Sequence, residues 1–94
     1  MKKRSALTER EPTKTELQLA EAIGMKNDNG YYLHWEEVLT GRPFSTIFTQ
    51  PPYFSTSIGW IPILKLIAKE KFNIILEENY DPERVSKEFL KKLS

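Results

Sequence analysis

Apolar and polar residues follow two rhythms along this chain, and each rhythm predicts a type of secondary structure. The clearest helical rhythm lies between Ser57 and Lys71, where apolar residues recur every three or four positions. Pro62 would fall in or just past the first turn, where a missing amide costs least. We therefore expect a well-buried helix that begins near Ser57 or Ile58. The residues on its apolar face are Trp60, Ile61, Leu64, Ile67 and Ala68.

A second helix is indicated near the N-terminus by its capping residues. Thr13 and Glu16 have the spacing of a capping box, in which the hydroxyl accepts an amide and the carboxylate reaches back. Gly24 suits the end of this helix, because glycine readily takes the left-handed conformation found there. The residues expected to share its buried face are Leu17, Ala20 and Ile23.

A third helix is predicted at the C-terminus. Asp81 and Pro82 have the composition of an N-cap followed by the first helical position. Val85, Phe89 and Leu93 follow at four-residue spacing and place an apolar stripe on one side.

Two segments have the alternating rhythm or the composition of strands. Residues 72–77 alternate most clearly, with Phe72, Ile74 and Leu76 on one face. Residues 31–35 are rich in aromatic residues, and as a strand they would place Tyr32 and His34 on the face opposite Leu33. Residues 36–39 can either extend that strand or form one helical turn. Residues 43–49 are expected to be irregular or weakly extended.

The order of these elements predicts an α+β fold. A small antiparallel sheet should pack with about three helices in the order α-β-α-β-α. The length of 94 residues indicates one domain, which we place at residues 13–94. Residues 1–12 are polar and charged, and we interpret them as a flexible basic arm.

Composition narrows the classes of function. Fourteen basic residues nearly balance thirteen acidic ones, for a net charge of +1, which argues against strong binding to phosphate backbones. Cysteine is absent, which fits a reducing compartment and rules out thiolate sites. No apolar run reaches the roughly 18–20 residues of a membrane span. The basic start is not followed by the apolar stretch of a signal peptide, so we expect a cytoplasmic protein.

Catalytic and metal-binding chemistry finds little support in the sequence. His34 is the only histidine, and a zinc site would need three or four ligands, so a structural or surface role is expected for it. Glu77, Glu78 and Asp81 form an acidic cluster, which we interpret as a strand end and a helix cap. We therefore expect no enzyme, no metal and no cofactor.

Binding residues are expected around the aromatic side chains, because tyrosine and tryptophan are frequent in interface hot spots. The Ser/Thr cluster at 55–57 is expected to cap the following helix; anion binding at the helix start is the alternative. The candidate binding residues are Tyr32, Trp35, Tyr53, Ser55, Thr56, Ser57 and Trp60.

The middle of the chain resembles small phage proteins of the NinX-like and phage ABA-sandwich kind. The resemblance covers about residues 15–26 and 50–78, where a proline or aromatic residue, a Ser/Thr cluster, a tryptophan, an apolar helix and a strand follow in order. Ser57 stands where that family often has Asp, and an aromatic residue after the strand is missing. The resemblance implies helices packed on a central antiparallel sheet and a phage or prophage origin. It carries over only Ser55, Thr56 and Ser57 as caps and Trp60 as a core or site-wall residue.

The favoured hypothesis is a small phage or prophage accessory protein that binds a host or phage protein in the cytoplasm of the bacterial host. An inhibitor of a host defence system is one concrete form of it. One alternative is nucleic-acid binding through Lys65, Lys69, Lys71 and the arm at residues 2–4. The other is binding of a nucleotide-like ligand at the helix start formed by residues 55–60. Homo-oligomerisation is left open.

Overall fold

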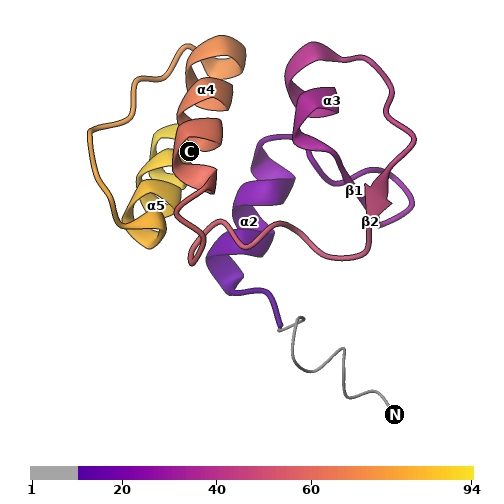
Figure 1. Ribbon diagram of the computed structural model, residues 1–94, viewed down its shortest axis with the longest axis horizontal. Coiled ribbons are helices and arrows are strands. Elements are labelled where there is room, and N and C mark those ends of the chain that lie inside the picture. Colours follow the sequence, from indigo (N-terminus) through magenta and orange to yellow (C-terminus); the bar gives the residue numbers. More distant parts are fainter. Residues whose placement is uncertain (1–10) are drawn as a thin grey trace.

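Helices and two very short strands alternate along the chain in the order α-β-α-β-α-α. The computed structural model describes residues 11–94, and the expectation of a flexible arm at 1–12 falls almost wholly outside this range (Figure 1). The α+β class expected from the sequence is confirmed. The elements are α2 (Lys14–Ala22), β1 (Tyr32–Leu33), α3 (Trp35–Thr40), β2 (Ile47–Phe48), α4 (Trp60–Phe72) and α5 (Pro82–Leu93).

The sheet consists of β1 and β2, which pair antiparallel. Tyr32 is opposite Phe48 and Leu33 is opposite Ile47, while Lys26 adds one isolated antiparallel bridge to Tyr32. So short a sheet cannot organise a core alone, because an isolated two-stranded pair is at best marginally stable in water.

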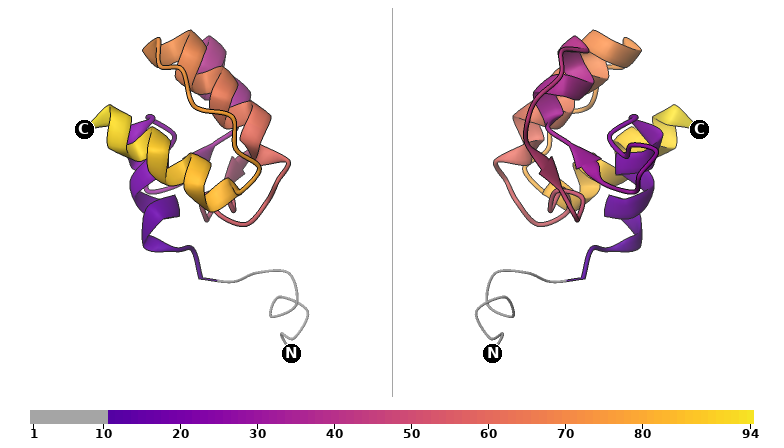
Figure 2. Two further views of the ribbon diagram at one scale, coloured as in Figure 1. Left: turned by 90° about the vertical axis from the view of Figure 1, so that its left-hand side faces the viewer. Right: turned by 90° about the vertical axis from the view of Figure 1, so that its right-hand side faces the viewer.

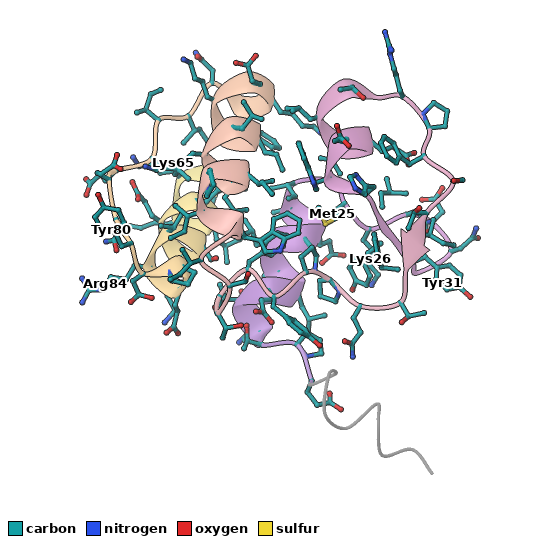
Figure 3. The ribbon with its side chains drawn as sticks, viewed as in Figure 1. Met25, Lys26, Tyr31, Lys65, Tyr80 and Arg84 are labelled. Carbon is teal, nitrogen blue, oxygen red and sulfur yellow. The ribbon has the colours of Figure 1, made fainter. Side chains whose placement is uncertain are left out.

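The core is instead built between helices. Helix α5 packs against both α2 and α4, and α3 packs against α4. Figure 1 shows α4 and α5 together on one side of α2, with α3 and the strands on the other, and Figure 2 shows α5 crossing α4. The fully buried apolar side chains at the centre are Leu19, Ala20, Ile23, Met25, Phe54, Leu64, Ile67, Ala68, Val85 and Phe89. Figure 3 shows Met25 inside the molecule, whereas Tyr31 and Tyr80 point outward at its edges.

The capping box of α2 is present, but the helix buries a different face from the one expected. Thr13 Oγ1 accepts the Glu16 amide and Glu16 Oε1 accepts the Thr13 amide. Leu17 is 42% exposed, while Glu16 and Leu19 are fully buried. The three-residue spacing predicted that Leu17 would be buried. The observed buried face instead consists of positions 16, 19, 20 and 23, and position 16 is an acidic residue.

Helix α4 buries the face predicted for it, with Trp60 half-buried at its first position. Its predicted start and caps are wrong. The N-cap is Gly59, and no side chain caps this end. The Trp60 and Ile61 amides instead donate to the carbonyls of Ser57 and Ile58, each at 3.0 Å, so a tight backbone turn replaces the Ser/Thr cap.

The strand predicted at residues 72–77 is wrong. Phe72 ends α4, Asn73 follows in the left-handed conformation with φ 56°, and residues 73–81 run as an irregular connection. Burial does alternate, since Leu76 is buried and Ile75 is 67% exposed. The backbone groups, however, find partners other than a neighbouring strand: the Ile74 amide donates to the Ala68 carbonyl at 2.8 Å, and the Ile75 carbonyl accepts from Lys92 Nζ at 2.9 Å. The Glu77 amide donates to the Glu88 carboxylate.

The strand predicted at residues 31–35 is confirmed only for its middle. Helix α3 begins at Trp35, so residues 36–39 are helical rather than extended. Tyr32 enters the core at 5% exposure while its neighbour Tyr31 is 41% exposed, so these two side chains lie on opposite faces as expected. The bridge from Lys26 and the pairing with β2 hold Tyr32 inward.

The C-terminal helix forms as predicted. Asp81 Oδ1 accepts the Glu83 amide at 3.1 Å, and Pro82 occupies the first turn. Val85 and Phe89 are fully buried. Among residues 11–94, none of the helices combines the length and the apolar character needed to cross a membrane.

Candidate functional site

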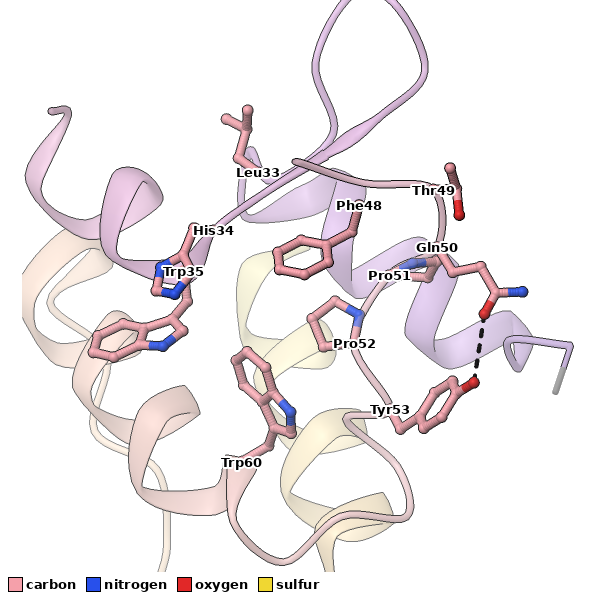
Figure 4. A pocket seen from close by; sticks show the side chains of 10 residues that line it. All are labelled: Leu33, His34, Trp35, Phe48, Thr49, Gln50, Pro51, Pro52, Tyr53 and Trp60. Atoms are coloured by element: carbon pink, nitrogen blue, oxygen red, sulfur yellow. Dashed lines mark hydrogen bonds between the residues drawn. The ribbon is translucent and has the colours of Figure 1, made fainter. Parts of the chain in front are cut away.

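A pocket of about 460 Å³ opens where the starts of α3 and α4 face the segment that follows β2 (Figure 4). Its lining is dominated by aromatic rings and two prolines, and it draws on segments far apart in the sequence. The lining residues are Leu33, His34, Trp35, Phe48, Thr49, Gln50, Pro51, Pro52, Tyr53 and Trp60.

Two tryptophans line this pocket, and each is the first residue of a helix. Trp35 opens α3 and Trp60 opens α4. The Trp60 ring meets the fully buried Phe54 ring edge to face, with 5.0 Å between centroids. Edge-to-face pairs of this kind fix ring orientation as well as bury area. The indoles are therefore held by helices and core rather than by loops.

His34 positions the α3 side of the pocket. Its Nδ1 accepts the Glu36 amide at 3.1 Å, which makes it the side-chain N-cap of α3. Its ring stacks on Phe44 at 4.4 Å between centroids and 5° between planes. The structural role expected for His34 is confirmed, because both contacts fix the backbone from which Trp35 projects.

The segment from Gln50 to Tyr53 forms another side of the pocket. Pro51 is buried and Pro52 is half-buried, and proline rings restrict the backbone of this stretch. The Tyr53 hydroxyl donates to Gln50 Oε1 at 3.4 Å. Just beyond, the Ser55 amide donates to the buried Glu16 carboxylate at 3.0 Å, which ties the segment to α2.

Two hydrogen-bond donors of the pocket have no acceptor within the described residues, and the pocket lining contains no basic side chain. Within residues 11–94, the indole N–H groups of Trp35 and Trp60 make no hydrogen bond, and no lysine or arginine lines the space. The Glu36 carboxylate carries a charge beside the pocket, because its Oε1 lies 3.8 Å from Nδ1 of the lining residue His34. Such a surface suits an apolar ligand that brings carbonyl acceptors.

Of the binding residues predicted from the sequence, the structure brings Trp35, Tyr53 and Trp60 together in this pocket. Tyr32 lies in the core and Ser55 is buried against Glu16. Thr56 and Ser57 do not line the pocket. Sequence reasoning did not assign the proline pair or Phe48 to the site, although their clustering between two aromatic segments was a usable signal.

The acidic cluster seen in the sequence is engaged in local contacts. Glu78 Oε1 accepts from Lys65 Nζ at 2.9 Å, and Asp81 caps α5. In the described part of the chain, no three histidine or acidic side chains come together as a metal site would require.

Comparison of the chain with protein-family models, curated proteins and solved structures finds no match. The resemblance to small phage proteins therefore stays a prediction. A proposal of function has to rest on the geometry and chemistry of the aromatic pocket.

Proposed function

We propose that this chain is a small phage- or prophage-derived accessory protein that acts by binding a protein partner at the aromatic pocket, without catalysis or a cofactor. One observation carries the proposal: Trp35 and Trp60, each fixed at a helix start, face one pocket of about 460 Å³. Pre-positioned aromatic side chains bind partners at a low entropic cost and supply most hot-spot energy. Inhibition of a host defence protein in the bacterial cytoplasm is one concrete form of this activity.

The surface around the pocket supports a protein partner over a small metabolite. Phe48, Phe44 and Ile47 are 44%, 39% and 49% exposed on the adjoining segment. Adjacent exposed apolar side chains extend the pocket into a larger patch, as expected of interaction sites.

The two alternatives find less support in the described contacts. Lys65 is paired with Glu78, and Lys71 Nζ donates to the Ile23 carbonyl at 3.1 Å, so two of the three lysines proposed for nucleic acid already have partners. A nucleotide phosphate at the start of α4 would need unpaired amides. The Trp60 and Ile61 amides already donate within the backbone turn.

The test compares capture from a bacterial lysate by the wild type and two matched variants. Phe48→Ala removes an exposed ring from the pocket, and Ile75→Ala removes an exposed side chain on the connection between α4 and α5. We expect a partner that Ile75→Ala retains and that Phe48→Ala captures about tenfold less, a loss of about 1.4 kcal/mol. Equal retention by both variants, with equal thermal stability, would contradict the proposal.

A further inference from the structure

We propose that the aromatic pocket takes a proline-rich peptide segment in the polyproline II conformation that carries one basic residue beside the prolines. This inference rests on the proposed function, protein binding at the pocket, and names the chemistry of the partner. Three properties of the pocket lead to it: its aromatic walls, its unused donors and the charge at its edge.

The walls match proline rings. In Figure 4 the side chains of Trp35, Phe48, Pro52 and Trp60 surround one space that opens to the outside. Aromatic-lined grooves of this kind bind polyproline II segments, because flat rings pack on pyrrolidine rings. Such a segment is already extended before it binds, so it loses little conformational entropy.

The two indole N–H groups without an acceptor match the backbone of a polyproline II segment. A tryptophan indole N–H can only donate, and those of Trp35 and Trp60 have no acceptor within residues 11–94. A polyproline II segment has no internal hydrogen bonds, so its carbonyls are free to accept. The two indoles that line the pocket can therefore hold successive carbonyls of one peptide. The side-chain Oε1 of Gln50, by contrast, already accepts from the Tyr53 hydroxyl.

The charge at the edge of the pocket indicates which residue the ligand carries beside its prolines. The Glu36 side chain is 47% exposed, and its Oε1 lies 3.8 Å from Nδ1 of the pocket residue His34. Among the described residues, no lysine or arginine pairs with it. A basic side chain next to the prolines would meet this carboxylate, and an acidic one would be repelled. We therefore assign a basic residue to the ligand at this end.

The experiment follows the two indole N–H signals of the full chain by nuclear magnetic resonance, one for each tryptophan. The probes are an oligoproline peptide, the same peptide with one terminal arginine, and a Gly/Ser peptide of equal length. We expect both indole signals to shift with oligoproline and not with the Gly/Ser peptide. Arginine should tighten binding about two- to fivefold, and Glu36→Gln should remove that gain.

Variants separate donor loss from loss of the fold. Trp60→Phe keeps a ring beside Phe54 but removes the N–H, and it should weaken oligoproline binding about three- to tenfold. Tyr31→Phe removes a polar group outside the pocket, from a side chain 41% exposed, and should change nothing.

Four results would overturn the inference: no shift of either indole signal, equal shifts with the Gly/Ser peptide, an arginine gain that persists in Glu36→Gln, or equal binding by Trp60→Phe. Shifts that depend on protein concentration without peptide would assign the pocket to a second copy and also overturn it. Because the peptides are synthetic, these results leave the lysate comparison of Phe48→Ala and Ile75→Ala standing. Failure of that comparison would remove the protein-binding function itself.

Discussion

The buried carboxylate of Glu16 accepts the backbone amide of Ser55, 39 residues further along the chain, at 3.0 Å. The same carboxylate accepts the Thr13 amide at 2.9 Å and so completes the capping box of α2. One side chain therefore stabilises the start of a helix and also fixes the segment that leads into the pocket. Its full burial is tolerated because both oxygens have donors.

Replacing Glu16 should destabilise the fold strongly. Glu16→Ala leaves the Ser55 amide buried without an acceptor, and we expect a loss of about 2–4 kcal/mol in the free energy of unfolding. Glu16→Gln should fall between the alanine variant and the wild type, because it retains one acceptor oxygen. Urea unfolding gives the measurement. The matched control is Glu21→Ala, an exposed glutamate on the same helix, and an equal loss in that variant would refute this role.

His34→Ala should loosen the α3 side of the pocket. It removes the acceptor of the Glu36 amide and the ring that stacks on Phe44, and we expect a loss of about 1 kcal/mol. Helix α3 has only six residues, so the Trp35 indole signal should move as well. His34→Asn supplies another capping oxygen and should recover most of the stability. A Trp35 signal unchanged in His34→Ala would show that the cap does not position the indole.

Glu88 should make stability depend on acid pH. Partial burial raises the pKa of its carboxyl, but the Glu77 amide and the Lys92 ammonium outweigh that effect and bring the pKa below 4.5. Because the folded state has the lower pKa, ionised Glu88 stabilises the fold fully above the unfolded value. That contribution is lost as the pH falls below about 4.5. The stability difference between wild type and Glu88→Gln, measured by urea unfolding, should shrink in this range; a constant difference would argue against it.

Gly24 and Gly41 form a matched pair of left-handed positions, with φ of 84° and 78°. An added Cβ at Gly41 meets nothing within 4 Å, whereas at Gly24 it would lie 3.2 Å from Lys71 Nζ. Both alanine variants should lose about 1–2 kcal/mol from backbone strain. Gly24→Ala should lose about 0.5–1.5 kcal/mol more, because it disturbs the bond from Lys71 to the Ile23 carbonyl. Thermal unfolding of the two variants should rank them in this order, and the reverse order would contradict the contact.

Local signals predicted the helices well, because their causes lie within a few residues. Thr13 with Glu16 and Asp81 with Pro82 cap their own helices, and the apolar spacing of α4 identifies its buried face. The pattern at 72–77 shows the limit of such signals. Alternation reports which side chains are buried, as at Leu76, but it does not say whether a second strand is present to pair with.

The sequence by itself determined the α+β class, most helix positions and the aromatic residues from which a site could form. Only the tertiary structure decided that Trp35, Tyr53 and Trp60 share one pocket while Tyr32 enters the core. It also decided that Ser55 binds Glu16 through its backbone instead of capping a helix. The physical reason is that capping and periodicity act between neighbours in the chain. Burial and long-range hydrogen bonds depend on which distant segments pack against each other.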